Sequence, residues 1–247
     1  MKIVISKTSQ EQGVNAAAFA AEVINFSIKE KGQARIVLST GSSQFDLFKA
    51  LVEMDIEWDK VEMFHLDEYI GLPETHPASF RKYLKERFIN FVPLKAIHFV
   101  MGEGDIESHI EDLTAKIREA PIDLGIVGIG ENAHIAFNDP PANFETTEAY
   151  IIVNLDLKCK QQQVREGWFP SVDEMPSQAI TMTPYQIMQC RTIISIVPHK
   201  VKAQAVKDTL ENALTNEIPA TMLKDHGNYT LFLDEASASL VDKELLI

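Results

Sequence analysis

The feature that most restricts the fold of this chain is an apolar, glycine-punctuated run near its middle, residues 124–130 (LGIVGIG). A strand that is apolar along both faces is typical of a parallel sheet with helices on each side. The residues that follow it at once are polar or titratable: Glu131, Asn132, His134, Asn138 and Asp139. Because α/β proteins place their ligand sites at the carboxyl ends of parallel strands, this segment predicts a buried strand with a candidate site at its end.

Strand-like and helix-like patterns alternate along most of the chain. Strands are predicted at residues 2–6, 34–38, 61–66, 96–100, 122–130, 178–182, 192–197 and 230–233. Helices are predicted at residues 10–29, 44–54, 78–88, 106–119, 155–164 and 203–214. The alternation predicts an α/β fold: a single Rossmann-like domain over residues 1–247, with a mainly parallel central sheet, helices on both faces and a small lid-like excursion at about residues 152–176.

The composition is that of an ordinary globular protein, and it argues against several classes of function. The formal net charge is −13 at pH 7, which disfavours a nucleic-acid partner because phosphate backbones attract basic surfaces. Cys159 and Cys190 form no CxxC pair, and no His, Cys or Asp residues have the spacing of metal ligands. No signal peptide or membrane-spanning run is apparent, so we expect a cytoplasmic protein with reduced cysteines and no membrane partner.

A second predicted strand, residues 61–66, leads directly into two carboxylates, Asp67 and Glu68. Two strands that both end in titratable groups are hard to explain as a solvated surface. His134 is suited to carry protons near neutral pH, and a carboxylate can act as a base where it is positioned and partly desolvated. By contrast, the basic residues of the helix at 78–88 are expected to form a solvated face: Arg81, Lys82, Lys85 and Arg87.

Residues 39–43 (STGSS) form a short turn between the strand at 34–38 and the helix at 44–54. Such a turn offers backbone N–H groups, hydroxyls and the positive end of a helix dipole to an anion. It lacks the lysine and the spacing of a Walker A loop. Serine capping of the helix would explain the same residues, so the residues alone leave both interpretations open.

Together, these segments resemble the glucosamine-6-phosphate deaminases, also called glucosamine-6-phosphate isomerases. The resemblance rests on LDEY at residues 66–69, GLP at 71–73, HP at 76–77, and GIG to HIAFNDP over residues 128–140. It implies that the chain isomerises opened glucosamine 6-phosphate to fructose 6-phosphate and releases ammonia. The amino group of such a substrate activates C2 itself, so the resemblance implies no cofactor, neither a metal nor pyridoxal phosphate nor a nicotinamide.

The resemblance also implies a role for each candidate catalytic residue. Asp67 matches the base that removes the proton from C2, and His134 matches the acid/base that opens the pyranose ring. Two supporting positions depart from the family: Asp139 stands where Glu is usual, and Asn132 stands where Asp is usual. An Asn orients an imidazole but brings no charge to stabilise the imidazolium. Ala133 replaces the usual Gly, and because Ala adopts a left-handed backbone poorly, we expect the local turn to differ.

Further residues are implied to bind the substrate and its phosphate. Lys202 aligns with the phosphate lysine of the family, and Lys200 is the alternative because the loop can be aligned in two ways. Arg165 is the nearest candidate for the arginine of the lid. The other substrate-binding or phosphate-binding positions are Gly41, Ser42, Ser43 and Glu68.

Two other functions remain open on the sequence. A 6-phosphogluconolactonase-like hydrolase shares the fold and a Gly-rich strand end followed by His. A catalytically silent sugar-phosphate sensor would retain phosphate binding and treat Asn132 as a lost catalytic group. The partner in each case is a small sugar phosphate, whose gluco or galacto configuration the sequence leaves open, and a homo-oligomer is one of the states that the resemblance allows.

Overall fold

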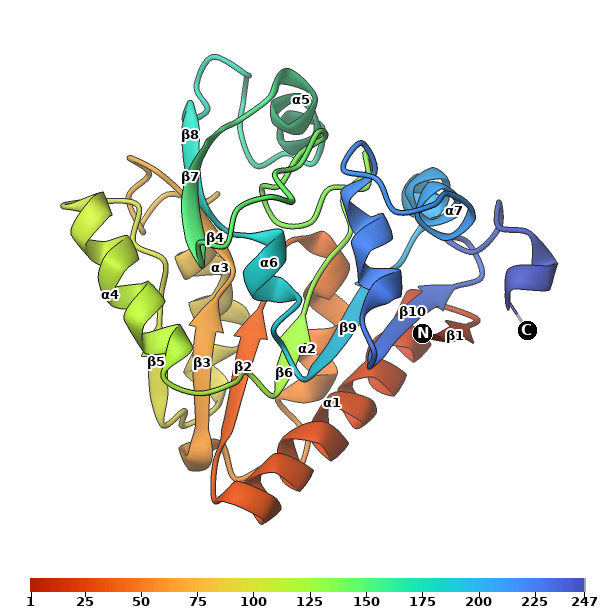
Figure 1. The fold of residues 1–247 in the computed structure, drawn as a ribbon, viewed down its shortest axis with the longest axis horizontal. Coiled ribbons are helices and arrows are strands. Elements are labelled where there is room, and N and C mark those ends of the chain that lie inside the picture. The colour runs from red at the N-terminus through yellow and green to blue at the C-terminus, as the bar shows by residue number, and fades with distance from the viewer. Residues whose placement is uncertain (247) are drawn as a thin grey trace.

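The computed structural model describes residues 1–246 and is built on a seven-stranded parallel sheet (Figure 1). Across the sheet the strand order is β1-β10-β9-β6-β2-β3-β5, and every neighbouring pair is parallel. The strands are β1 (Lys2–Ser6), β2 (Ala34–Leu38), β3 (Val61–His65), β5 (Ala96–His98), β6 (Leu124–Ile126), β9 (Thr192–Val197) and β10 (Tyr229–Asp234). The predicted α/β class and the parallel sheet are confirmed.

Helices cover both faces of this sheet, because the central strands carry apolar side chains on both faces. Ile36 and Leu38 of β2 point into the layer that holds α1 (Ser9–Lys31), α2 (Phe45–Leu51) and α3 (Phe80–Arg87). Val37, between them, points into the opposite layer. That layer holds α4 (Ile106–Arg118), α6 (Pro184–Ile187) and α7 (Ala203–Glu211). The apolar run at residues 124–130 is therefore buried on both sides, as its composition predicted.

Helix α1 shows how local sequence sets these contacts. The Thr8 side chain caps its first turn by accepting a hydrogen bond from the Glu11 N–H, and Gly32 ends it in the left-handed conformation. The buried face consists largely of small residues (glycine, alanine and serine), which let α2 approach closely. A Cβ at Gly13 would lie 2.6 Å from the backbone carbon of Asp46, so only glycine permits this approach.

A second sheet lies above the carboxyl ends of the central strands (Figure 1). It consists of β4 (Asp67–Tyr69), β8 (Gln178–Met182) and β7 (Tyr150–Asn154), which pair antiparallel. The strand predicted at 178–182 is present, but it belongs to this small sheet and not to the parallel one. The predicted strand at 61–66 ends at His65, and Asp67 begins a strand of the second sheet.

The segment that follows β7 contains α5 (Leu157–Arg165) and packs onto the second sheet, in the place predicted for a lid (Figure 1). Phe169 anchors it, with its ring centroid 5.4 Å from that of Tyr69 and 5.3 Å from that of His76. Leu155, Cys159 and the partly buried Trp168 pack in the same apolar cluster. This cluster holds the segment over the ends of the central strands.

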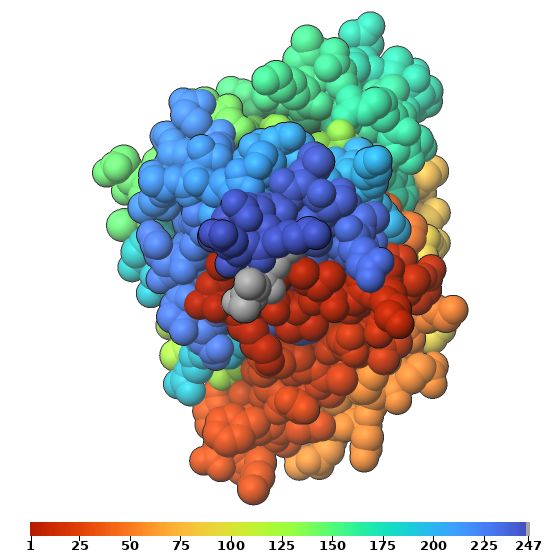
Figure 2. Space-filling model, turned by 90° about the vertical axis from the view of Figure 1, so that its right-hand side faces the viewer, coloured from red at the N-terminus to blue at the C-terminus, as the bar shows by residue number. Residues whose placement is uncertain are grey.

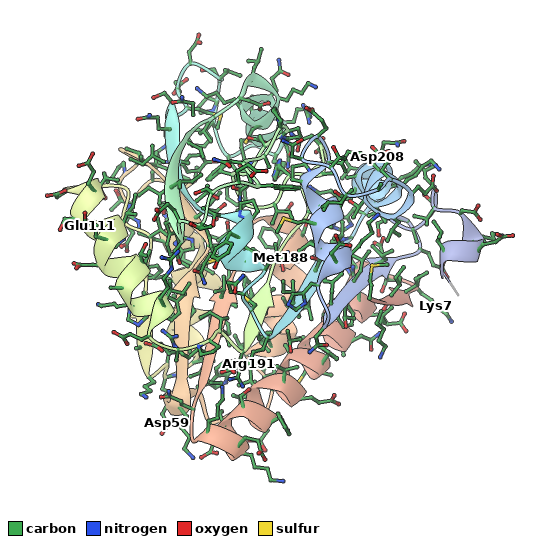
Figure 3. All side chains as sticks on the ribbon, viewed as in Figure 1. Lys7, Asp59, Glu111, Met188, Arg191 and Asp208 are labelled. Carbon is green, nitrogen blue, oxygen red and sulfur yellow. The ribbon has the colours of Figure 1, made fainter. Side chains whose placement is uncertain are left out.

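The amino and carboxyl ends of the central strands lie on opposite sides of the sheet. Asp59 and Arg191 mark the amino ends of β3 and β9, far from α5 (Figure 3). At one lateral edge, β1 pairs with β10, so the first and last strands of the sheet adjoin (Figure 2). The loops that leave the carboxyl ends of β2, β3, β6 and β9 gather on the side of α5.

Candidate active site

The strand order reverses its direction between β2 and β6, and the candidate site lies at that point. From β2 the chain continues to β3 and β5 on one side, and it then returns to β6 and β9 on the other. Such a reversal leaves a crevice at the carboxyl ends of the strands, where α/β proteins bind ligands. The cavity there is lined from four strand ends: Gly41, Ser42 and Ser43 after β2, Asp67 after β3, Gly130 and His134 after β6, and Lys202 after β9.

Asp67 is a buried carboxylate of the cavity. It is 5% exposed and lines the cavity. Within residues 1–246, no group forms a hydrogen bond or ion pair with its carboxylate. Burial raises the pKa of Asp67 well above its ordinary value of 3.8, and the negative charge of Glu68 raises it further. A carboxylate in this environment binds a proton more tightly than one in water, as a base for a C–H proton requires.

Glu68 has a different surrounding from Asp67, because adjacent strand residues point to opposite faces. Its carboxylate accepts hydrogen bonds from the backbone N–H of Phe80 (3.2 Å) and of Arg81 (2.9 Å) at the start of α3. It also accepts from the Ser79 hydroxyl (2.9 Å). Glu68 is 0% exposed and is not among the residues that line the cavity. The structure thus places Glu68 as an anchor of α3, away from the position expected of a substrate ligand.

Arg81 departs from the sequence-based expectation of a solvated basic face. It is only 1% exposed, because its guanidinium donates to Glu68 (3.2 Å), to the Leu72 carbonyl (2.8 Å) and to Glu103 (3.1 Å). Helical periodicity could not reveal this, since the partners of Arg81 come from three separate segments.

His134, Asn132 and Asp139 form one connected cluster. The Nδ1 atom of His134 lies 3.1 Å from Asp139 Oδ1, and the Asn132 amide donates to the same oxygen over 3.2 Å. Asn132 in turn accepts from the backbone N–H of His134 (3.3 Å). Burial raises the pKa of Asp139, but His134, Asn132 and the Cys159 thiol together hold it below its ordinary value. Asp139 therefore stays ionised beside the imidazole, while Nε2 is left for a ligand.

The turn that presents His134 depends on its small residues. A Cβ at Gly130 would lie 2.2 Å from the imidazole Nε2, so glycine alone lets the ring lie over this backbone. Ala133 adopts the left-handed conformation with φ 61°, held by a hydrogen bond from the Ala220 N–H to its carbonyl (2.9 Å). Ala133 thus adopts the left-handed backbone itself, at a cost of about 1–2 kcal/mol.

Residues 39–43 form a loop that lines the cavity beside Gln44; we call it the 39–43 loop. Gly41 has φ 105°, a conformation that L side chains rarely adopt. In the part of the chain that the structure describes, the N–H groups of Gly41, Ser42 and Ser43 donate to no protein acceptor. The buried Ser39 hydroxyl also has no hydrogen-bond partner there. Donors of a partly buried loop that have no acceptor within residues 1–246 favour the anion-binding interpretation over simple helix capping.

Lys202 lines the cavity, whereas Lys200 is exposed and does not. Lys202 is 6% exposed, and no residue in the range 1–246 forms an ion pair with it. Burial lowers the pKa of Lys202, and the carboxylates of Glu166 and Glu131 raise it by a smaller amount. Of the two alternatives in the sequence, the geometry therefore favours Lys202 as the ligand of an anion.

Comparison with known proteins places this geometry in a family. A sequence profile described as glucosamine-6-phosphate isomerases/6-phosphogluconolactonase matches residues 7–232. The chain belongs to this family.

Members of the glucosamine-6-phosphate isomerase/6-phosphogluconolactonase family with curated names are similar to it over nearly their full length. A glucosamine-6-phosphate deaminase of Thermoanaerobacter sp. (strain X514) is 35% identical, over 99% of this chain and 96% of the relative. One from Lactobacillus delbrueckii subsp. bulgaricus is 31% identical, over 98% of this chain and all of the relative.

Solved structures of the family share the fold. A structure described as a monomeric glucosamine-6-phosphate deaminase superposes with a TM-score of 0.88 at 28% identity, covering 97% of this chain and 100% of the other. The 6-phosphogluconolactonase of Trypanosoma brucei superposes with a TM-score of 0.81 at 16% identity, covering 98% of each chain. At that identity the likeness concerns the fold alone.

In this family member the α5 segment supplies cavity residues that sequence reasoning missed. Gln162 and Trp168 both line the cavity, and both donate to Glu166: the Gln162 amide over 2.7 Å and the Trp168 indole over 3.2 Å. Arg165, the arginine expected here, is 58% exposed, pairs with Glu131 over 2.6 Å and is not among the lining residues. The i, i+4 spacing of Gln162 and Glu166 was the only signal of this pair in the sequence.

Among residues 1–246, no three His, Cys, Asp or Glu side chains converge as metal ligands would. Within the same residues, no helix has the length and apolar character needed to cross a membrane.

Proposed function

We propose that this family member converts glucosamine 6-phosphate to fructose 6-phosphate and ammonia. The observation that carries the proposal is the buried Asp67 carboxylate, which has no partner among residues 1–246 and shares one cavity with His134 and with the N–H groups of the 39–43 loop. The curated relatives named glucosamine-6-phosphate deaminases support the same assignment. The reaction belongs in the cytoplasm, where charged sugar phosphates are retained.

In the proposed mechanism Asp67 acts as the base for isomerisation. Its carboxylate removes the proton from C2 of the opened amino sugar and returns it to C1. Water then adds at C2, and the amine leaves as ammonia. Because Asp67 lies in a desolvated cavity, its pKa is raised toward the range in which a carboxylate abstracts protons effectively.

His134 opens the pyranose ring in the same proposal. Its Nδ1 lies 3.1 Å from Asp139 Oδ1, so the carboxylate stabilises the imidazolium while Nε2 exchanges a proton with the ring oxygen or the C1 hydroxyl. Asn132 supports this arrangement through its hydrogen bonds to Asp139 and to the His134 backbone. Asp139 alone therefore supplies the negative charge in this cluster.

The substrate phosphate is assigned to cavity residues other than Asp67 and the His134 cluster. The N–H groups and hydroxyls of the 39–43 loop would donate hydrogen bonds to the phosphate oxygens, and Lys202 would supply the positive charge. Glu68 and Arg165 are left out of the proposed binding set, because neither lines the cavity.

The proposal is tested by incubating the purified protein with glucosamine 6-phosphate and following ammonia and fructose 6-phosphate in parallel. We expect both products in equal amounts. Turnover of 6-phosphogluconolactone or galactosamine 6-phosphate instead would assign the chain a different activity within the same superfamily. No turnover of any of these, together with thermal stabilisation by sugar phosphates, would assign the chain to the sensor class.

A further inference from the structure

Tyr83 joins α3 to the 39–43 loop through a single hydrogen bond. Its hydroxyl donates to the Gly41 carbonyl over 2.7 Å, while its ring lines the cavity. The same carbonyl accepts a second hydrogen bond from the Gln44 N–H over 3.0 Å. The proposed function assigns no role to Tyr83, and the family resemblance carried none to this position.

The hydrogen bond from Tyr83 fixes the orientation of the whole peptide unit between Gly41 and Ser42. A trans peptide unit is planar, so its C=O and N–H point in opposite directions. The Gly41 carbonyl and the Ser42 N–H belong to one peptide unit. Because Tyr83 holds the carbonyl on the side of α3, the Ser42 N–H is turned the other way. Gly41, at φ 105°, has few steric restrictions of its own to prevent this unit from flipping.

The Ser42 N–H that this unit orients, and the donors beside it, have no acceptor within residues 1–246. The N–H groups of Gly41, Ser42 and Ser43 form no hydrogen bond within residues 1–246, and the Ser39 hydroxyl beneath them is also unpartnered. Lys202, 6% exposed, brings the positive charge to the same cavity. The loop is therefore arranged for an anion before the anion arrives, and its orientation determines how many donors reach it.

Tyr83 is itself held rigidly. Its ring stacks on Phe45 with centroids 5.7 Å apart and lies edge-on to Trp168 at 6.4 Å. The Arg87 guanidinium lies 5.4 Å from the ring centroid. Burial raises the pKa of the Tyr83 hydroxyl, although Arg87 lowers it, so the hydroxyl keeps its proton and remains a donor.

We propose that Tyr83 is a positioning residue that orients the 39–43 loop for the substrate phosphate and thereby sets phosphate affinity without taking part in the chemistry. The proposal rests on the proposed function, because it assigns the phosphate to this loop. Glu68 supports this role of Tyr83. It anchors the first turn of α3, from which the Tyr83 side chain reaches the loop.

The test is the Tyr83→Phe variant, which removes the hydroxyl and keeps the ring and its stacking. We expect the Kd for fructose 6-phosphate and for inorganic phosphate, measured by calorimetry, to rise about three- to tenfold, the usual effect of one lost hydrogen bond. In steady state the KM for glucosamine 6-phosphate should rise by the same factor, with kcat within about twofold. A general loss of folded protein would instead lower kcat and the thermal midpoint together.

Tyr150→Phe is the matched control, because Tyr150 is also buried and also donates to a backbone carbonyl, that of His65 (3.0 Å). We expect it to leave the Kd for inorganic phosphate unchanged. If Tyr83→Phe keeps the wild-type Kd, or if Tyr150→Phe raises it equally, the inference is wrong while the proposed function stands. If the wild-type protein neither binds nor turns over sugar phosphates, both are wrong.

Discussion

Both ends of the central sheet bury charged groups, but two of those at the carboxyl end lack the partners that Asp123 has at the amino end. At the amino end, Asp123 is 2% exposed, accepts from the Arg35 N–H (3.0 Å) and pairs with Lys31. The Arg35 guanidinium in turn donates to Glu62 (2.5 Å). At the carboxyl end, Asp67 and Lys202 are almost as deeply buried, and neither has a partner within residues 1–246.

The paired charges at the amino end stabilise the fold, whereas the two unpaired groups at the carboxyl end lie in the proposed active site. A buried charge is tolerated where partners offset its desolvation, as around Asp123. An unpaired buried charge persists only because the rest of the fold offsets its cost, and such groups are concentrated at functional sites. Substitutions at the two ends should therefore have opposite consequences for stability and activity.

The largest effect on activity is expected from Asp67→Asn at the unpaired end. Removal of the base should lower kcat by about 10²–10⁴-fold and leave sugar-phosphate affinity within about tenfold. Ammonia release measures the first quantity and calorimetry with fructose 6-phosphate the second. A variant that kept most of its activity would show that Asp67 is not the base.

Gly130→Ala should affect activity through His134. The new Cβ would lie 2.2 Å from the imidazole Nε2, so the ring must move from its present position. A displacement of about 1 Å in a catalytic group costs roughly 10²-fold in rate, and we expect a loss of that order in kcat. Gly128→Ala is a matched control, because a Cβ there would lie 3.5 Å from its nearest neighbour, the Gln44 amide. Equal losses in the two variants would contradict the steric argument.

Asp123→Ala at the paired end should reverse this pattern. It leaves the buried Arg35 N–H without an acceptor and Lys31 without its partner, and it should lower the free energy of unfolding by about 2–3 kcal/mol. The kcat per folded molecule should stay unchanged. Denaturant unfolding measures the free energy of unfolding. A lower kcat with unaltered stability would contradict the contrast drawn between the two ends of the sheet.

The pH dependence of stability distinguishes the two ends as well. Because the pKa of Asp67 is raised well above 3.8 in the folded state, the native protein holds a proton that the unfolded chain has released at the same pH. Stability should therefore fall as pH rises from about 4 toward the folded-state pKa of Asp67. Asp67→Asn should remove this part of the fall and be more stable than wild type near neutral pH. Unfolding curves from pH 4 to 8 that run parallel for the two proteins would exclude this contribution.

The smallest effect is expected from Asn132→Asp. The new carboxylate would face Asp139 Oδ1, which now accepts from the Asn132 amide over 3.2 Å, so the free energy of unfolding should fall by about 1 kcal/mol above pH 5. A second negative charge near His134 would also stabilise the imidazolium, so kcat on the closed pyranose should rise by up to about threefold. A lower kcat would mean that Asn132 belongs to a different relay.

The fold was largely predictable because its strands carry strong local signals. The boundaries of β2 and β8 match the prediction, and the parallel sheet follows from apolar runs that alternate with helices. The assignment of β8 to a separate antiparallel sheet was not predictable, because its apolar pattern is the same in either sheet. Which strands pair depends on contacts between residues more than 100 positions apart, as in the pairing of Asp67 with Thr181.

The candidate site was predictable in part. Asp67, His134 and Lys202 carry recognisable sequence contexts, and the structure brings them to one cavity. The burial of Arg81 and the exposure of Arg165 could not be read from the sequence, because each depends on partners from distant segments. The roles assigned to these residues stay predictions until the variants above are measured.

The pairing of β1 with β10 affects the order in which the chain can fold during synthesis. Lys2 lies opposite Thr230, so the first strand made has no partner until the last strand of the sheet has emerged. Strands β2, β3 and β6 can pair earlier, because all three lie within residues 34–126. Contacts of such long sequence separation form slowly. We therefore expect the half of the site made by β2, β3 and β6 to be assembled before Lys202 and the β1 edge complete the sheet.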